Sequence, residues 1–391
     1  MKLYLFNPEH DLALAHGLVR YLPPLVVRKF ADDFSLLPFW YAEDKSKILL
    51  FNDDQLASLE RYNQLFNRSI QGVLPSQIKH INNVEVMPWG WDYTIREWLI
   101  ENEIPEEFLP NEEYLKKLTQ LSHRSFSVEL LSKLQISPYF CGESYLFNSL
   151  EELNCFVEQQ EATVLKEPLS GSGRGIMWCE NTLILSLQVW AKRIIERQNG
   201  VVGEPRYNKI VDFAMEFYIS STGVCDFISY SLFNTSSFGS YQGSFLLSDE
   251  KIEEQLSKYV PLTELNHLKK ILKYQFEILV KDSYQGYLGV DMMICSFDDS
   301  PYYRIHPCVE VNFRMNMGVV AFFIRKHILS FQSQGKFDTY FYRSDGEALA
   351  KHLEMEDKYP LRIENNQLVS GYFPLVPVTS TSRYRAWVII E

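Results

Sequence analysis

A glycine-rich segment behind a lysine is the first stretch of this sequence whose composition suggests chemistry. The segment "KEPLSGSGRGIMW" (166–178) follows the apolar run "ATVLK". Glycines let backbone N–H groups approach an anion closely, and the hydroxyls of Ser170 and Ser172 add hydrogen-bond donors. The segment matches neither the G-x-x-x-x-G-K-[ST] phosphate loop nor the G-x-G-x-x-G dinucleotide fingerprint. By itself it is either a turn in a hairpin or a backbone cradle for phosphate.

Two acids and an amide form a second set of residues that could bind a ligand or take part in a reaction. Asp291 lies in "GVDMMI", and Glu310 and Asn312 lie in "CVEVNFR", which we expect to be two strands of one hairpin joined by a "DDSP" turn. Because strand side chains alternate between faces, Glu310, Asn312 and Arg314 would point the same way. Such an oxygen-rich set suits Mg²⁺. A half-exposed hairpin without a ligand would show the same alternation, so this pattern alone does not show whether the hairpin binds a metal ion.

Size and composition limit the classes of protein to consider. The chain has 391 residues, which predicts two or three packed units. Its formal net charge of −12 argues against a nucleic-acid binder, whose surface needs a basic patch.

The six cysteines include no C-x-x-C pair, so we expect reduced thiols and neither a zinc site nor a disulfide framework. No apolar window approaches the about 20 residues of a membrane span, and "MKLYLFNPEHDL" predicts a strand and a loop, not a signal peptide. We therefore expect a cytoplasmic protein that binds neither membranes nor nucleic acids.

Helix and strand patterns alternate along the chain. In the first hundred residues three short apolar runs, each followed by a polar turn, predict the strands of an open α/β sheet. The ligand sites of such sheets lie beyond the carboxyl ends of the strands. Ser149 is a predicted N-cap, because Glu152 follows it at the spacing of a capping box. The predicted helices include 54–70, 149–160, 185–200, 262–282 and 319–331, and the predicted strands include 162–166 and 209–220.

The order of these motifs resembles that of the ATP-grasp superfamily of ATP-dependent ligases. The chain contains a strand ending in lysine, a serine–glycine loop, "VVGEP", "VDFAMEF", a long helix, "GVDMM" and "EVNFR", in that order. The resemblance covers about residues 121 to 318, and "E-V-N-x-R" with its upstream aspartate is the most specific element. It implies an α/β (α+β) chain in which two α+β subdomains clasp ATP. The implied domains are an N-terminal α/β domain of the kind that precedes ATP-grasp modules (1–120), an ATP-grasp domain (121–334, its small subdomain over 121–205 and its large one over 206–334) and a C-terminal mixed α/β extension packing on the ATP-grasp domain (335–391).

The resemblance also implies roles for individual residues. The residues implied to bind ATP are Lys166 at the α- and β-phosphates, Ser170, Gly171, Ser172, Gly173 and Gly175 in a flap over the triphosphate, Glu204 before the adenine hinge, and Asp212 at the ribose hydroxyls. The implied Mg²⁺ ligands, with Mn²⁺ as an alternative ion, are Asp291, Glu310 and Asn312. Arg314 and Arg174 would neutralise charge on the γ-phosphate or on an acyl phosphate.

Two positions depart from the family pattern. The helix that usually begins with a lysine reads "LSHRSFSVELLSKL", so that Arg124 would take the place of that lysine. Gly289 stands two residues before the first metal acid, where some members of the family have a basic residue. A degenerate, non-catalytic nucleotide-binding protein is therefore one alternative, and an ATP-grasp kinase or phosphotransferase is another. A third is that the hairpin and the glycine loop are structural coincidences.

The second substrate would bind to loops of the N-terminal domain. In "NPEHDLALAHG" (7–17), Glu9, His10 and Asp11 are placed to hold an amine or a polar head group. The alternative is that Asn7 or Asp11 only caps the helix that follows. The expected reaction is a ligation, in which ATP phosphorylates a carboxylate and an amine or thiol then displaces the phosphate. The sequence identifies neither substrate nor the oligomeric state, although the resemblance allows a homodimer.

Overall fold

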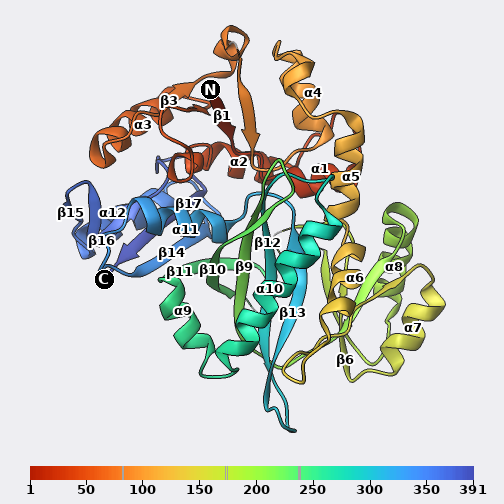
Figure 1. Ribbon diagram of the computed structural model, residues 1–391. Helices are drawn as coiled ribbons and strands as arrows, with labels where there is room; N and C mark the ends of the chain where they lie inside the picture. The colour runs from red at the N-terminus through yellow and green to blue at the C-terminus, as the bar shows by residue number, and fades with distance from the viewer. Residues whose placement is uncertain (82, 172, 174, 237–238) are drawn as a thin grey trace. The chain divides into compact units, whose positions relative to one another are not determined.

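The chain forms two compact units. A computed structural model describes residues 1–81, 83–171, 173, 175–236 and 239–391 (Figure 1). Unit 1 comprises Met1–Leu115, Gln242–Ser248 and Arg314–Glu391, and unit 2 comprises Lys116–Tyr241 and Asp249–Phe313. Residues 335–391, expected to extend the ATP-grasp domain, are thus grouped with the N-terminal segment. The domain boundaries drawn from the sequence stay a prediction.

The N-terminal part of unit 1 is the predicted open α/β sheet. Its strands are parallel, in the order β3-β2-β1-β4. Asn52 and Asp92 begin two of its helices, because their side chains accept hydrogen bonds from the backbone N–H groups of Gln55 and Ile95. The elements are β1 (Lys2–Leu5), α1 (His10–His16), α2 (Leu25–Asp33), β2 (Lys47–Leu49), α3 (Asp53–Phe66), β3 (Gln71–Val73), β4 (Glu85–Pro88) and α4 (Tyr93–Glu101). Helix α5 (Glu112–Ser122) begins in unit 1 and continues into unit 2.

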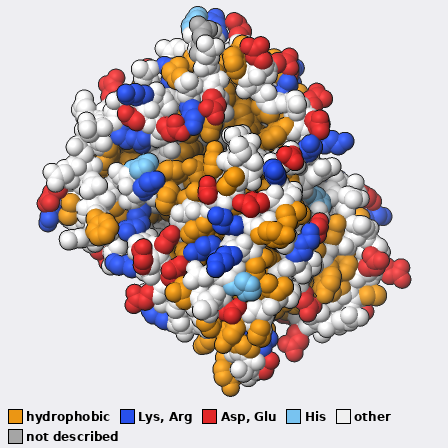
Figure 2. Space-filling model, in the orientation of Figure 1, with side chains coloured by type: hydrophobic (Ala, Val, Ile, Leu, Met, Phe, Trp, Pro, Cys, Tyr) orange, Lys and Arg blue, Asp and Glu red, His pale blue; other side chains and the backbone are white. Residues whose placement is uncertain are grey.

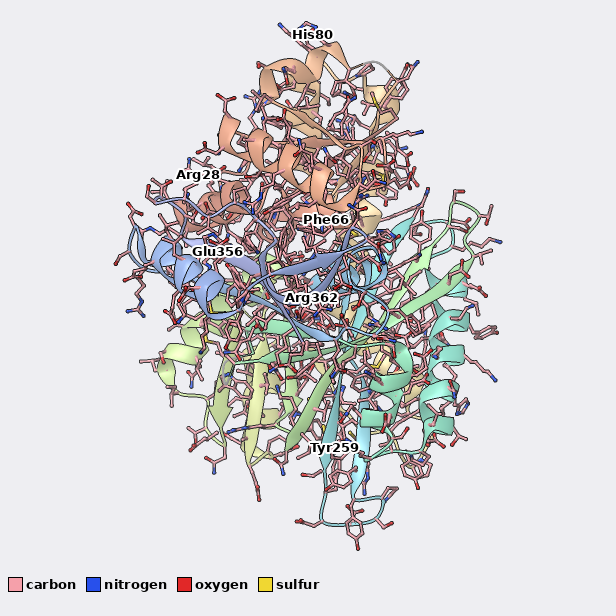
Figure 3. All side chains as sticks on the ribbon, turned by 90° about the vertical axis from the view of Figure 1, so that its left-hand side faces the viewer. Arg28, Phe66, His80, Tyr259, Glu356 and Arg362 are labelled. Carbon is pink, nitrogen blue, oxygen red and sulfur yellow. The ribbon has the colours of Figure 1, made fainter. Side chains whose placement is uncertain are left out.

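The C-terminal segment completes the core of unit 1. Phe373 packs edge-on against Phe66, with ring centroids 5.4 Å apart, and the Trp40 indole donates a hydrogen bond to the carbonyl of Leu375 at 2.7 Å. Figure 3 labels Phe66 on α3 and Glu356 and Arg362 in the C-terminal segment. The strands here pair antiparallel in the order β11-β14-β17-β16-β15. The elements are β11 (Tyr241–Leu246), α11 (Met317–His327), β14 (Gly335–Phe341), α12 (Glu347–Lys358), β15 (Arg362–Glu364), β16 (Gln367–Pro374) and β17 (Tyr384–Ile390).

Unit 2 contains a small sheet and a group of long strands. The small sheet has the order β5-β8-β6-β7, and the long strands are antiparallel in the order β13-β12-β9-β10. Ser149 caps α7 as predicted, by accepting hydrogen bonds from the N–H groups of Glu151 and Glu152. The elements are α6 (Ser125–Leu134), β5 (Tyr145–Phe147), α7 (Leu150–Glu158), β6 (Ala162–Lys166), β7 (Ile176–Glu180), α8 (Leu185–Gln198), β8 (Val201–Pro205), β9 (Lys209–Ile219), β10 (Cys225–Thr235), α9 (Asp249–Leu256), α10 (Leu262–Leu279), β12 (Gly286–Ser296) and β13 (Tyr303–Asn312).

The long strands of unit 2 have one apolar and one polar face. On β9 the side chains of Phe213, Met215 and Phe217 are completely buried, and the Phe217 ring packs against Phe276 of α10 at 5.5 Å. Figure 1 shows α10 lying across β9, β12 and β13. At the free end of the β12–β13 hairpin, Tyr259 contacts Tyr303 with ring centroids 5.1 Å apart (Figure 3). Because α10 covers the apolar face, the polar side chains of these strands lie on the opposite face.

Two further expectations concern the surface and the thiols. Among the residues that the structure describes, no helix is long and apolar enough to cross a membrane. On the face shown in Figure 2, acidic and basic side chains are interspersed. All six cysteines are free thiols.

Candidate functional site

The glycine-rich segment is the connection between the antiparallel strands β6 and β7. Lys166 at the end of β6 pairs with Ile176 at the start of β7, so the loop covers 167–175. This is too long for a two-residue turn. Gly173 and Gly175 have φ angles of 73° and 67°, in the left-handed region that favours glycine. Ser172 and Arg174, both proposed to contact phosphate, lie outside the described residues. The segment is thus a long hairpin loop, and its role as a flap over phosphate stays a prediction.

Lys166 forms a buried ion pair with Glu204. Its Nζ lies 2.6 Å from Oε2 of Glu204 on β8, and each residue is only 5% exposed. Ser144 donates to the other carboxylate oxygen at 3.0 Å. An ammonium group has three N–H donors, so Lys166 can hold Glu204 and still donate to a phosphate. The structure therefore places side by side the two residues proposed for the phosphates and for the adenine hinge.

Arg124 joins the glycine-rich loop to β13. Its Nη2 donates to both carboxylate oxygens of Glu310, at 2.8 and 2.9 Å, and its Nη1 donates to the Ser170 hydroxyl at 2.7 Å and to the carbonyl of Glu167. The residue is 3% exposed, and its Nε has no hydrogen-bond partner among the described residues. Hydrogen bonds between a guanidinium and a carboxylate are charge-assisted and stronger than those between neutral groups. One side chain thus connects a proposed flap residue with a proposed metal ligand.

The proposed metal ligands lie together on the hairpin of β12 and β13. Asp291 and Glu310 are directly opposite each other in the register, and the Asn312 amide donates to Asp291 Oδ2 at 3.0 Å. Like charges opposite each other on antiparallel strands are destabilising, so a cation bound between these two carboxylates would offset their repulsion. Arg124 supplies positive charge at Glu310. The oxygen-rich donor set also fits Mg²⁺, which takes its remaining ligands from phosphate and water. Within the described ranges no group of three or more His, Cys, Asp and Glu could hold a metal, so Asn312 and non-protein oxygens would have to complete the site.

The polar sheet face contains acids beyond those proposed from the sequence. Asp212 accepts hydrogen bonds from Lys209, at 2.5 Å, and from the Thr235 hydroxyl, at 2.7 Å. Glu216, which is 1% exposed, lies four residues further along β9 and pairs with Gly289, which in turn pairs with Asn312. Because residues paired across strands share a face, Glu216 lies on the face of Asp291. Sequence reasoning missed Glu216, although the alternation in "VDFAMEF" would have assigned it to the side of Asp212.

The residues expected to hold the second substrate lie in unit 1. Asp11 forms an ion pair with Arg314, whose Nε donates to both carboxylate oxygens at 2.9 and 3.1 Å. His10 is 1% exposed, and Glu9 is half-buried. Glu9 occupies the N-cap position of α1 and its side chain makes no capping hydrogen bond, so neither Asn7 nor Asp11 is the N-cap residue. Arg314 and Asp11 are thus brought together, and any anion that Arg314 binds would share it with Asp11.

Burial disfavours the ionised form of the Glu9 carboxyl group. Desolvation, together with the nearby carboxylates of Asp92 and Asp32, raises the pKa of Glu9 to about 7. The folded protein therefore binds more protons than the unfolded chain between the usual glutamate pKa and 7, and its stability falls as the pH rises through this window. A Glu9→Gln variant should be more stable than the wild type at pH 8, by up to about 3 kcal/mol, and no more stable at pH 4. Urea unfolding at the two pH values measures this, and equal gains at both would contradict the ionisation argument.

Comparison with known proteins identifies the fold. No protein-family model and no curated protein matches the chain. Biotin carboxylase from Campylobacter jejuni, solved as a beta-gamma-ATP complex, superposes with a TM-score of 0.53 at 12% identity, over 100% of this chain and 87% of that one. The chain has the ATP-grasp fold. Two further ATP-grasp structures match at 11% identity and a TM-score of 0.47: N5-carboxyaminoimidazole synthetase from Staphylococcus aureus complexed with ADP (89% of this chain, 94% of that one) and L-amino acid ligase from Bacillus licheniformis (88% and 93%). The ATP-grasp fold expected from the motifs, and the α/β class, are thereby confirmed.

Proposed function

We propose that this chain is an ATP- and Mg²⁺-dependent ligase, which activates a carboxylate as an acyl phosphate for attack by an amine or a thiol. The observation that carries the proposal is the acidic pair on the β12–β13 hairpin. Asp291 and Glu310 oppose each other, Asn312 is hydrogen-bonded to Asp291, and Arg124 binds Glu310. This arrangement occurs in an ATP-grasp fold, and the similar biotin carboxylase structure is described as an ATP complex. Both facts support a nucleotide–metal site on this hairpin.

The proposed roles follow from charge and position. Mg²⁺ held by Asp291, Glu310 and Asn312 would supply electrostatic stabilisation of the triphosphate. Lys166, already oriented by Glu204, would hold the α- and β-phosphates, and Arg124 would hold a phosphate oxygen beside the loop. Pre-positioned cations of this kind supply most of the catalysis in phosphoryl transfer.

Two bond exchanges make up the proposed reaction. An oxygen of the substrate carboxylate bonds to the γ-phosphorus of ATP, and the bond to the β-phosphate oxygen breaks, which gives an acyl phosphate and ADP. The nitrogen or sulfur of the acceptor then bonds to the acyl carbon and loses a proton, and inorganic phosphate leaves. We propose that Arg314, together with Arg174 outside the described residues, offsets the negative charge of these species.

Binding of Mg-ATP is the first expected result. Free Mg-ATP at 100 times its dissociation constant should add about 2.7 kcal/mol to the free energy of unfolding. A thermal-shift titration with Mg-ATP measures this, and ATP with excess EDTA controls for the metal. No stabilisation even at millimolar Mg-ATP would contradict the proposal.

Turnover distinguishes the ligase from its two alternatives. In a screen of carboxylates and amines, a ligase releases ADP and phosphate and forms a condensed product. A kinase or phosphotransferase forms a phosphorylated product without condensation. A non-catalytic protein binds Mg-ATP without turnover. The last alternative has some structural support, because Arg124 occupies both carboxylate oxygens of a proposed metal ligand.

A further inference from the structure

The parallel sheet of unit 1 has a topological switch point between β1 and β4. From β1 the chain adds β2 and then β3 on one side, and β4 lies on the other side of β1. In open α/β sheets, ligands bind outside the carboxyl ends of the strands where the order reverses in this way. The loop that leaves β1 runs from Phe6 to Glu9, and the loop that leaves β4 runs from Trp89 to Asp92. These two loops therefore define a place where the fold favours a ligand.

Asn7 and Asp92 fasten the two loops to each other. The Asn7 amide donates to the carbonyl of Gly90 at 2.7 Å and to Asp92 Oδ2 at 3.2 Å. Asp92 Oδ1 accepts from the N–H of Ile95 at 2.9 Å and so begins α4. Asn7 is 2% and Asp92 1% exposed. Both oxygens of Asp92 are thus engaged in holding the loops, so this residue positions its neighbours.

His10 and Glu9 are polar groups that this framework leaves unsatisfied. The His10 ring is buried against Gly90, where a Cβ would come within 2.5 Å of the ring. Within the described part of the chain neither ring nitrogen of His10 has a hydrogen-bond partner, nor has the buried Oε2 of Glu9. The Nδ1 of His10 lies 3.6 Å from Asp92 Oδ2, beyond hydrogen-bonding distance. Buried polar groups without partners are costly, and a bound group that forms hydrogen bonds with them would offset that cost.

The chemistry of these groups selects a cation with N–H donors. The two loops and the start of α1 carry two carboxyl groups and an imidazole, from Glu9, Asp92 and His10, and Arg314 in the same unit is already bidentate on Asp11. Each oxygen of Asp92 already accepts one hydrogen bond, so Glu9 and His10 are the groups of these segments that have atoms without partners among the described residues. Two groups are fewer than the protein ligands that a zinc or calcium site normally has. An ammonium group donates three hydrogen bonds and carries the compensating charge.

We infer that the two loops bind the ammonium group of an amine substrate, with Glu9 and His10 as its direct partners and Asp92 holding together the loops that position them. The inference rests on the proposed function, in which an amine is the acceptor of the activated carboxylate. It excludes a thiol acceptor without an amino group, and so narrows the substrate class.

Because Glu9 titrates, the pH dependence of amine binding by the wild type tests the inference without any variant. The carboxyl group must ionise to pair with an ammonium ion, and the groups that act on it are Asp92, Asp32 and its own backbone N–H. With a Glu9 pKa of about 7, affinity for an amine that stays protonated should rise about tenfold between pH 6 and pH 8. An acceptor held by uncharged groups would show no such rise.

The experiment uses a panel of primary amines with the full chain. Methylamine, ethanolamine, putrescine and the standard amino acids are screened by thermal shift, and the best binder is titrated by calorimetry at pH 6 and pH 8. Loss of a charge-assisted hydrogen bond in Glu9→Gln should weaken binding about 10- to 100-fold at pH 8 and abolish the pH dependence. Asp92→Asn should weaken binding by loosening the contacts that hold the two loops, and Glu101→Gln, an exposed acid on α4, is the matched control that should bind like the wild type.

Each outcome bears on the inference. It is overturned if the wild type binds no amine of the panel, if Glu9→Gln binds as tightly as the wild type, or if Zn²⁺ or Mn²⁺ alone stabilises the wild type and not Glu9→Gln. The Mg-ATP shift, measured on the same samples, separates the two proposals. Mg-ATP binding without amine binding refutes only this inference, and amine binding without an Mg-ATP shift refutes only the ligase.

Discussion

A Glu310→Gln variant is expected to release ADP about 100- to 1,000-fold more slowly than the wild type, because it loses one of two opposed carboxylates at the proposed metal site. The neutral amide is a weaker ligand for Mg²⁺ and offers one acceptor oxygen, whereas Arg124 Nη2 donates to both oxygens of Glu310. Steady-state ADP release at saturating Mg-ATP, with the amine and carboxylate found in the screen, measures the effect. Full activity in the variant would mean that the metal site lies elsewhere.

The control for this variant must separate lost catalysis from lost folding. Arg124 is 3% exposed and keeps a buried charge when its carboxylate partner is removed, so some loss of stability accompanies Glu310→Gln. Asp291→Asn removes the other acid of the pair without touching the contacts of Arg124 and should also impair ADP release. Glu180→Gln, at an exposed position on β7, should behave like the wild type. A variant that unfolds at the same urea concentration as the wild type but does not turn over has lost chemistry alone.

A Lys166→Met variant is expected to be destabilised by about 3–5 kcal/mol, since it leaves the Glu204 carboxylate buried without its counter-charge. Lys166 and Glu204 are each 5% exposed, and their charged atoms lie 2.6 Å apart. Removing both charges, in Lys166→Met with Glu204→Gln, should recover most of the lost stability, because no unpaired ion then remains. Urea unfolding of the wild type, the two single variants and the double variant gives the coupling free energy.

Nucleotide binding by the same four proteins tests the second role of Lys166. If Lys166 also holds the α- and β-phosphates, the double variant should regain stability and still show no stabilisation by Mg-ATP. A double variant that binds Mg-ATP as tightly as the wild type would show that the ion pair has a structural role only.

Sequence patterns anticipated the parts of the fold that depend on neighbouring residues. The alternation in "CVEVNFR" and the short turn before it predicted a hairpin with Asp291 and Glu310, and the structure has these two residues directly opposite. The N-cap at Ser149 was predictable because a cap depends on the next three residues. The order of motifs identified the ATP-grasp fold although overall identity to a similar solved structure is only 12%.

Contacts between distant residues could not be predicted in this way. Arg124 and Glu310 are 186 residues apart, and nothing local indicates that the guanidinium would bind that carboxylate. Glu216 lies next to the proposed metal ligands only through the pairing of β9 with β12. The contact between the loops that follow β1 and β4 could not be predicted from local sequence either. Asn7 and Asp92 are 85 residues apart, and only the strand order makes their loops adjacent.

The sequence by itself thus determined the class of fold, the hairpin with its acids and the glycine-rich loop behind Lys166, because periodicity, turns and caps depend on interactions between near neighbours. Only the tertiary structure decided which charges are paired, with Lys166 on Glu204, Arg124 on Glu310 and Arg314 on Asp11, and which polar groups remain unsatisfied beside them. The physical reason is that partners for buried charges are chosen by packing between segments far apart in the chain, and local patterns do not encode that choice.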